Sequence, residues 1–394
     1  MKKILVLNSG SSSLKYQLFN VENDKYEMIA KGVADRIGIN GSVVEIKFPD
    51  GTKRKREVAL PTHNEAINEV ISELLNGALT SMNEIDAVGH RIVQGGDIFK
   101  HSVLVTEEVI NQIEGLAELA PLHNHAHVLG IRAVEKLLPD VPQTVVFDTA
   151  FHQTMPKEAF LYALPLEQYT KHKIRRYGFH GTSHAYVSEK AAELIGKKGK
   201  IITCHLGNGA SISAIDNGIC LDTSMGFTPL AGLVMGTRCG DIDPYIPLYI
   251  CKSQNKTPDE VNEILNKRSG MFGLCGYSDN RDVETLYGVE EKATVAMDTY
   301  VHSIIRFIGA YVAVLGGVDA IVFTAGIGEN GALLRRLVIE KLAYLGIILD
   351  EKANEKRGAI TEISAPGSKV RAFIIPTDEE YMIAKDTMKV VFGE

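Results

Sequence analysis

The first strands are predicted by alternating apolar and polar residues near the start of the chain. An apolar run over 4–7 enters the polar segment 8–13, and apolar residues then alternate with polar ones over 14–18. Alternation with a period of two is typical of a half-buried strand, and short segments rich in glycine and serine are typical of turns. We therefore expect a β-hairpin whose tip carries several hydroxyl groups.

A second unit of the same kind follows half a chain later. The apolar run 201–204 enters the glycine-containing segment 205–211, and a return strand is predicted near 219–221. Gly10 and Gly207 are 197 positions apart, which is half of the 394 residues. This spacing is what a duplicated architecture would produce.

Two further pairs of strands recur in the same order. The apolar segments 85–89 and 318–322 each lead into a glycine-containing turn, whereas the strands that start at 145 and 373 each end in acidic residues. Together with the two hairpins, these pairs predict two related α/β domains.

Helical periodicity fills the intervals between the strands. Capping-box patterns at 62–65 and 257–260 predict helix starts, and apolar residues three and four positions apart predict helices over 304–315 and 334–345. A final helix is expected over 379–391. Because no proline- or serine-rich linker separates the halves, we expect the two domains to pack across a cleft.

Composition and charge limit the partners. The chain has 42 lysines and arginines against 49 acidic residues, a net charge of −7, and it lacks the basic surface that nucleic acid or anionic lipid demands.

The apolar stretch 307–318 is shorter than the roughly 20 residues of a membrane span, so we expect a buried helix there. The apolar run 4–7 is too short for a secretory signal. Five scattered cysteines predict reduced thiols, and we expect a cytoplasmic protein.

Three glycine-rich segments are candidate phosphate sites. The two hairpin tips would offer backbone N–H groups and hydroxyls to a nucleotide, and neither a Walker nor a Rossmann glycine pattern occurs in the chain. Segment 326–330 follows a strand and precedes a helix expected from Leu333, and helix N-termini favour anions. The alternative for each segment is an ordinary turn that needs glycine only for its dihedral angles.

Cations and acids stand at the predicted strand ends and loops. Arg91 and Arg238 lie beside glycines in loops, and phosphoryl transfer needs guanidinium groups fixed on the phosphoryl oxygens. Asn8, Asp148 and Glu379 offer oxygen ligands that suit Mg²⁺. A structural role remains open for each: an ion pair for the arginines, a turn cap for Asp148, and the N-terminus of the final helix for Glu379.

These motifs resemble the acetate kinase family, within the acetate and sugar kinase, heat-shock chaperone and actin superfamily. The resemblance rests on segments 6–15, 89–91, 147–152, 177–181, 203–212, 235–241 and 325–330. It implies two actin-like (ribonuclease H-like) α/β domains with a nucleotide cleft between them, formed by residues 1–150 with 380–394 and by 151–379. It also implies a homodimer that transfers the γ-phosphoryl group of ATP to acetate reversibly, giving ADP and acetyl phosphate, with Mg²⁺ or Mn²⁺.

The resemblance also implies a role for individual residues. The catalytic group is Arg91, Asp148, His180 and Arg238; the two arginines hold the carboxylate and the moving phosphoryl group, which His180 contacts. Asn8, Asp148 and Glu379 surround the metal, and Val93, Leu122, Phe179 and Pro229 line a small pocket for the substrate methyl group. The nucleotide contacts are Ser11, Ser13, Lys15, His205, Leu206, Gly207, Asn208, Gly209, Asp279, Asn280, Arg281, Gly326, Ile327, Gly328, Glu329 and Asn330.

One segment departs from the family pattern. His125 and His127 stand where the family has a proline and, two positions on, an asparagine. If the segment is extended, His123, His125 and His127 face one way and suit a transition metal. The interpretation that we favour is that His125 and His127 are surface or interface residues without a chemical role.

The acceptor decides what Asp148 does. A sugar kinase needs a general base, whereas a carboxylate with a pKa of about 4 to 5 is already ionised at pH 7. We therefore expect Asp148 to orient the metal and water. Two alternatives stay open. The first is a propionate or butyrate kinase, although Val93 favours a smaller substrate. The second is an actin-like or chaperone-type ATPase, although such a protein has no reason to keep both arginines beside His180.

Overall fold

The computed structural model describes residues 1–119 and 123–393, and the chain divides into two compact units. The first contains residues 1–150 and 378–394, and the second contains residues 151–377. The chain re-enters the first unit at Asp378, two residues before the boundary at 380 that the resemblance implies. Glu379 therefore belongs to the first unit.

The first unit is built on an eight-stranded sheet of order β5-β4-β3-β2-β1-β6-β8-β7. Its strands are β1 (Lys2–Ser9), β2 (Ser13–Glu22), β3 (Lys25–Asp35), β4 (Val43–Lys47), β5 (Lys53–Glu57), β6 (Ala87–Ile92), β7 (Val103–Leu104) and β8 (Gln143–Phe147). Its helices are α1 (His63–Leu75), η1 (Met82–Glu84), α2 (Glu107–Gly115), α3 (Asn124–Leu137) and α15 (Glu379–Phe392).

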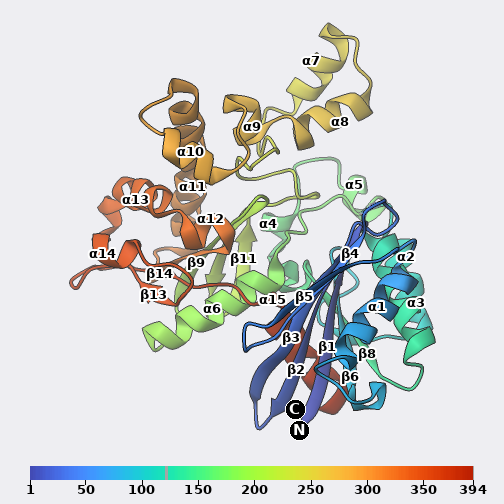
Figure 1. Cartoon of the computed structure of the whole chain (residues 1–394). Helices are drawn as coiled ribbons and strands as arrows, with labels where there is room; N and C mark the ends of the chain where they lie inside the picture. The colour runs from blue at the N-terminus through green and yellow to red at the C-terminus, as the bar shows by residue number, and fades with distance from the viewer. Residues whose placement is uncertain (120–122, 394) are drawn as a thin grey trace. The chain divides into compact units, whose positions relative to one another are not determined.

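Alternation along β1 assigns the two faces of this sheet. Leu5 and Leu7 pack with α1 and α3 in one apolar cluster, whereas Ile4 and Val6 pack with α15 in another. Figure 1 shows α1 and α3 on one side of these strands and α15 on the other. Strands β1, β6 and β8 are parallel neighbours, so their carboxyl ends meet at one edge of the sheet. That edge carries most of the candidate residues of this unit.

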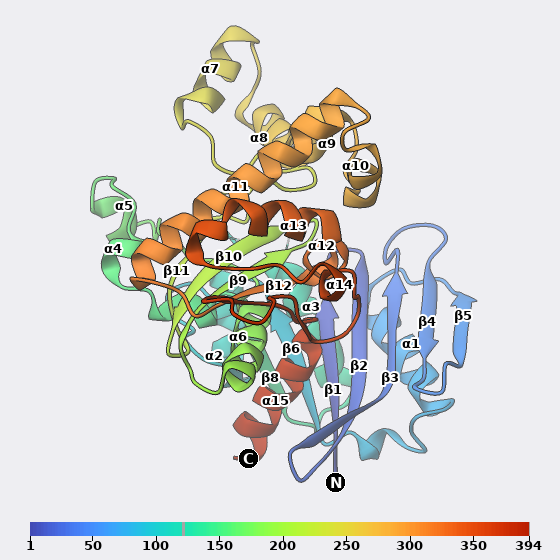
Figure 2. The same cartoon turned by 90° about the vertical axis from the view of Figure 1, so that its left-hand side faces the viewer.

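The second unit is built on a six-stranded sheet of order β11-β10-β9-β12-β14-β13. Its strands are β9 (Lys200–Leu206), β10 (Ala210–Asp216), β11 (Ile219–Thr223), β12 (Ala320–Thr324), β13 (Thr361–Glu362) and β14 (Arg371–Ile374). Its helices are η2 (Ala150–Thr154), α4 (Lys157–Phe160), α5 (Glu167–Thr170), α6 (Gly181–Ile195), α7 (Tyr245–Ser253), α8 (Pro258–Lys267), α9 (Gly270–Cys275), α10 (Asn280–Leu286), α11 (Glu291–Leu315), α12 (Ala325–Asn330), α13 (Ala332–Lys341), η3 (Ala343–Leu345) and α14 (Glu351–Asn354). Figure 2 shows α6 and α11 on opposite sides of these strands.

The two sheets share one topology, which confirms the predicted pair of related α/β units. In each, three antiparallel strands are followed by two parallel ones: β3-β2-β1-β6-β8 in the first and β11-β10-β9-β12-β14 in the second. Both predicted hairpins are present as β1–β2 and β9–β10. Both capping boxes are formed, at Thr62 and Thr257.

Three expectations about helices are wrong. Segment 326–330, expected as an open turn, belongs to α12, because Ala325 makes the turn out of β12 with a left-handed φ of 64°. Helix α11 is amphipathic rather than buried all round, since Val295 and Val314 are about half exposed, at 51% and 49%. The segment 334–345, expected as one helix, is divided between α13, which ends at Lys341, and the short 3-10 helix η3 that begins at Ala343.

Two expectations from composition bear on the whole chain. Within residues 1–119 and 123–393, no helix has the length and apolar character that crossing a membrane requires. All five cysteines are free thiols.

Candidate active site

Arg91 is the centre of a polar group in the first unit. The Asp148 carboxylate accepts two hydrogen bonds from its guanidinium, from Nε at 2.8 Å and from Nη2 at 2.6 Å. Nη1 donates to Asn8 Oδ1 at 3.3 Å, and Glu379 Oε2 lies 3.8 Å from Nε. The structure therefore brings together the three candidate metal ligands and one candidate catalytic arginine.

The sheet register explains this convergence. Asn8 lies near the end of β1, and Asp148 directly follows β8. Arg91 lies near the end of β6, so the expectation that it stands in a loop is wrong. The Asp148 N–H donates to the Ile92 carbonyl at 2.9 Å, which extends the β6–β8 pairing by one residue. Glu379 is added by the first turn of α15, where an acidic residue also stabilises the helix dipole.

The charge state of this group is fixed by its own members. Arg91 is 20% exposed and Asp148 only 2% exposed. Burial on its own would lower the pKa of Arg91, but the negative charges of Asp148 and Glu379 outweigh burial and raise it. Arg91 is therefore a permanent cation, held in one orientation by a bidentate ion pair.

The same oxygens fit a hard divalent cation. Asn8, Asp148 and Glu379 offer amide and carboxylate oxygens, without nitrogen or sulfur, which is the donor chemistry of Mg²⁺. Among the described residues there is no group of three or more His, Cys, Asp or Glu side chains that could hold an ion. This sparse set of ligands suits an ion that keeps most of its water and phosphate ligands.

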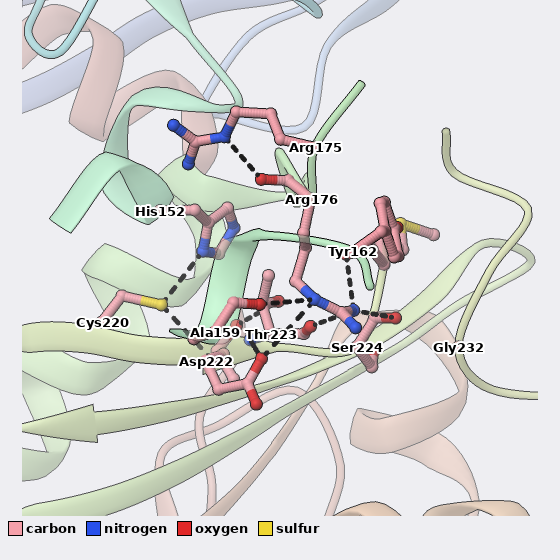
Figure 3. Close-up of polar contacts among 12 residues, drawn as sticks. His152, Ala159, Tyr162, Arg175, Arg176, Cys220, Asp222, Thr223, Ser224 and Gly232 are labelled. Atoms are coloured by element: carbon pink, nitrogen blue, oxygen red, sulfur yellow. Dashed lines mark hydrogen bonds and ion pairs between the residues drawn. The ribbon is translucent and has the colours of Figure 1, made fainter. Parts of the chain in front are cut away.

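In the second unit, the segment before His180 is fixed by structural cations. Figure 3 shows the Arg176 guanidinium among backbone carbonyls, with Nη1 donating to Thr223 at 2.8 Å and to Ser224 at 3.2 Å. Arg175 Nε donates to the Arg176 carbonyl at 3.0 Å and its guanidinium stacks on Phe160. These two arginines hold the polypeptide in place.

His152 fixes the residue next to His180. Its Nδ1 lies 3.2 Å from Cys220 Sγ, as Figure 3 shows. Its Nε2 lies 2.9 Å from the Phe179 carbonyl. Burial lowers the pKa of His152 to about 4, so the ring is neutral. Because a carbonyl only accepts, Nε2 carries the proton and donates it to Phe179.

His180 itself adopts an unusual backbone conformation. It is the N-cap of α6 with φ 57° and ψ 26°, a left-handed conformation that costs a non-glycine residue about 1–3 kcal/mol. Its ring stacks on His205 at a centroid distance of 4.1 Å, and its Nδ1 lies 2.9 Å from Ser211 Oγ. Strain of this kind concentrates at functional sites.

Arg238 differs from Arg91 in having no carboxylate partner among the described residues. It is half-buried, burial lowers its pKa, and its Nη1 donates only to the Pro229 carbonyl, at 3.2 Å. A half-buried guanidinium without a counter-ion is suited to binding an anion.

Gly209 lies close to the side chains of both Arg238 and His180. A Cβ added at Gly209 would lie 3.4 Å from Arg238 Nη1 and 3.6 Å from His180 Nε2. The tip of the β9–β10 hairpin therefore leaves a space between these two cationic or proton-donating groups. A side chain at position 209 would occupy this space.

The other candidate nucleotide-binding residues of the second unit lie in several different elements. Asn208 packs against Gly236, whose N–H donates to the Asn208 carbonyl at 3.2 Å. Asn280 lies beside the end of α12, since a Cβ at Gly331 would lie 3.5 Å from its Nδ2. His205 and Gly207 belong to the end of β9 and the hairpin tip, and Leu206 is fully buried, so only its backbone is available. The remaining members of the second unit are Asp279 and Arg281, paired with each other at the start of α10, and Gly326, Ile327, Gly328, Glu329 and Asn330 in α12.

Ser11, Ser13 and Lys15 belong to the first unit. They lie on the β1–β2 hairpin, whose tip is closed by a hydrogen bond from the Gly10 N–H to the Ser13 carbonyl at 2.6 Å. Val93 and Phe179 are buried, Pro229 is half-buried, and Leu122 lies outside the described residues.

The histidine-rich segment is helical, which overturns two interpretations. His125 and His127 lie in the first turn of α3, so the extended metal site does not form. His127 is 3% exposed and belongs to the buried face of α3, rather than to the surface. Burial, reinforced by the positive charge of Arg91, lowers its pKa to about 3.

The sequence did not reveal the partners that orient the histidines. Ser211 lies within segment 203–212, which resembles the family, but no role was expected for it, and His184 lies four residues after His180. A spacing of four on a helix places two side chains on one face, which is the one signal that could have linked them.

Comparisons with known proteins agree over the whole chain. The model of the Acetokinase family matches residues 3–385. The acetate kinase of Dictyoglomus turgidum is 54% identical over 99% of this chain and 98% of its own. The crystal structure of Porphyromonas gingivalis acetate kinase matches with a TM-score of 0.94 and 47% identity, and that of a propionate kinase from Francisella tularensis with 0.93 and 41%; each alignment covers 99% of this chain and 100% of the other. The range that the family model matches contains Arg91, Arg238, His180 and every candidate metal ligand, and the chain belongs to the acetokinase family.

Proposed function

We propose that this chain is an acetate kinase, which transfers the γ-phosphoryl group of ATP to acetate and forms ADP and acetyl phosphate reversibly. Similarity to an acetate kinase at 54% identity over nearly the whole chain carries the proposal. The site residues support it, because two fixed guanidinium groups are what a reaction between an anion and a polyanion requires.

In this proposal Arg91, Arg238 and His180 are the groups that stabilise the charge of the reacting anions. Arg91 is a permanent cation, whereas Arg238 is a half-buried cation without a counter-ion. The reaction requires both to stabilise negative charge on the acetate carboxylate and the transferred phosphoryl group. His180 adds a hydrogen-bond donor beside Arg238.

Asp148 is unsuited to act as a general base. Both of its oxygens already accept hydrogen bonds from Arg91, and an acetate anion has no proton to give up at neutral pH. We assign Asp148, with Asn8 and Glu379, to hold Mg²⁺ through water. The ion would neutralise phosphate charge when it binds with the nucleotide.

We assign nucleotide binding to the second unit. Its β9–β10 tip, the start of α10 and α12 supply backbone N–H groups and amide side chains that suit ATP and ADP.

We further propose a homodimer in the cytoplasm. No residue of α7, all of which the structure describes, is buried, and Tyr245, Leu248 and Tyr249 are more than half exposed. An apolar surface of this kind is typical of an interface, and we assign it to a second copy of this chain. Free thiols and the use of ATP suit the cytoplasm. Sedimentation should show a dimer that Tyr249→Glu weakens, and a wild-type monomer would contradict the assignment.

Trapping the acyl phosphate with hydroxylamine tests the activity. Acetate, propionate and butyrate are supplied side by side with ATP and Mg²⁺, and we expect the highest kcat/KM with acetate. Similarity to a propionate kinase at 41% identity makes propionate the second candidate. ATP hydrolysis that ignores all three acids, without hydroxamate, would contradict the proposal.

A further inference from the structure

A chain of buried hydrogen bonds leads away from His180. Its Nδ1 lies 2.9 Å from Ser211 Oγ, which lies 2.7 Å from His184 Nε2, and His184 Nδ1 lies 2.7 Å from Thr203 Oγ1. Thr203, His184 and Ser211 are fully buried. Burial also lowers the pKa of His184 well below its usual value, so its ring is neutral and carries one N–H.

The hydrogens along this chain can run in only two directions. In the first, Thr203 donates to His184 Nδ1, His184 Nε2–H donates to Ser211, and Ser211 donates to His180 Nδ1. In the second, every bond is reversed: His180 Nδ1–H donates to Ser211, Ser211 donates to His184 Nε2, and His184 Nδ1–H donates to Thr203.

Thr203 decides between these directions. Its hydroxyl has one hydrogen, and among the described residues the acceptor within hydrogen-bond distance is His184 Nδ1. The second direction would leave this buried hydroxyl hydrogen without an acceptor, which is costly. The first direction uses every hydrogen of the chain.

We propose that Thr203, His184 and Ser211 are positioning residues that hold His180 as the tautomer with its proton on Nε2. That nitrogen and Arg238 Nη1 lie 3.6 Å and 3.4 Å from the position that a Cβ at Gly209 would occupy. The inference rests on the proposed contact of His180 with the phosphoryl group. A neutral ring in this tautomer donates a hydrogen bond to a phosphoryl oxygen, whereas the other tautomer would present a lone pair to it.

The neighbours of His180 make a neutral donor useful. Its ring stacks on His205, Arg238 lies across Gly209, and His184 lies beyond Ser211. A proton added to His180 would create a second cation beside Arg238 and would reverse the whole chain. The chain thus supplies a hydrogen-bond donor without requiring that His180 be charged.

Ring-nitrogen NMR tests the tautomer directly. In protein labelled with ¹⁵N in the histidine rings, long-range ¹H–¹⁵N spectra identify the protonated nitrogen, and the His180 signals are those that His180→Gln removes. We expect Nε2–H in the wild type at neutral pH and a rising share of Nδ1–H in Ser211→Ala and Thr203→Val. A wild-type His180 protonated on Nδ1, or a tautomer that neither variant changes, would overturn the proposal.

Kinetics test the consequence. Loss of a whole transition-state donor costs about 10²–10³ in kcat, so partial loss of the tautomer in Ser211→Ala should lower kcat by about tenfold, with both KM values nearly unchanged. Ser211→Thr, which keeps the hydroxyl, should recover most of it. Ser213→Ala is the matched control, since Ser213 is equally buried on β10 and bonds Thr223 Oγ1 at 2.9 Å instead.

Two results separate this inference from the proposed function. Full activity in His180→Gln would refute the role of His180 while leaving the tautomer spectra interpretable. A shifted tautomer in Ser211→Ala with unchanged kcat would overturn the positioning role that is proposed here.

Discussion

Arg91 and Arg238 carry the same charge in opposite surroundings. The carboxylate of Asp148 holds Arg91 through two hydrogen bonds, whereas Arg238 donates only to a backbone carbonyl among the described residues. Arg91 therefore stabilises the fold as well as supplying a positive charge, whereas the positive charge of Arg238 is suited to binding a ligand. Removing each guanidinium should therefore have different effects on stability.

Replacing either arginine by alanine should lower kcat/KM by at least about 10²-fold, the scale of losing one charge-stabilising group. Arg91→Ala should also lower the free energy of unfolding by about 3 kcal/mol, because it removes both hydrogen bonds and the positive charge that Arg91 gives to the buried Asp148 carboxylate. Arg238→Ala should retain nearly all of its stability. Hydroxamate kinetics and urea unfolding measure the two effects, and equal destabilisation by both variants would contradict this distinction.

Val93 tests the acyl specificity. It is buried and follows β6, two residues after Arg91. If it lies beside the substrate methyl group, Val93→Ala should raise the propionate-to-acetate ratio of kcat/KM by about tenfold, since one methylene in such a pocket contributes about 1–3 kcal/mol. The nucleotide KM should not change. An unchanged ratio in a folded variant would remove Val93 from the acyl pocket.

At the scale of elements, a substitution at the hairpin tip between β9 and β10 should change activity without changing stability. Gly209 does not have a positive φ, and a Cβ there would lie at ordinary van der Waals distances from Arg238 and His180. Gly209→Ala should therefore fold normally but occupy the space proposed for the phosphoryl group.

We expect Gly209→Ala to lower kcat by about tenfold or more, comparable to losing part of a transition-state contact, while Tm changes by only a few degrees. Gly115→Ala is a control, because a Cβ at Gly115 meets no atom within 4 Å. Wild-type kinetics in Gly209→Ala would show that the space beside His180 and Arg238 is not used.

Local sequence signals predicted some elements and misjudged others for physical reasons. The hairpins and capping boxes depend on neighbouring residues, so they could be predicted. The glycines of 326–330 predict a turn in that segment, yet the left-handed residue is Ala325 ahead of them, and the glycines belong to α12. The bond between Ser211 and His184 depends on how β10 packs against α6, which no local pattern contains.

At the scale of the whole molecule, buried neutral histidines link folding to pH. Burial lowers the pKa of His90 to about 4, that of His152 to about 4 and that of His127 to about 3. In the unfolded chain each would return to about 6.5. Because the unfolded state binds more protons between these values, the contribution of each histidine is complete above about pH 6.5 and is lost as the pH falls toward 4.

Acid should therefore destabilise the protein steeply. Each such histidine contributes a slope of up to about 1.4 kcal/mol per pH unit between roughly pH 6 and pH 4, and the three act together in the same range. Urea unfolding measured at half-unit steps of pH should give a free energy of unfolding that falls with this combined slope. His152→Gln keeps a donor for the Phe179 carbonyl but cannot titrate, so its slope should be shallower by about one proton. An unchanged slope in this variant would mean that His152 is not held neutral, and that the contact fixing the residue before His180 does not depend on its uncharged ring.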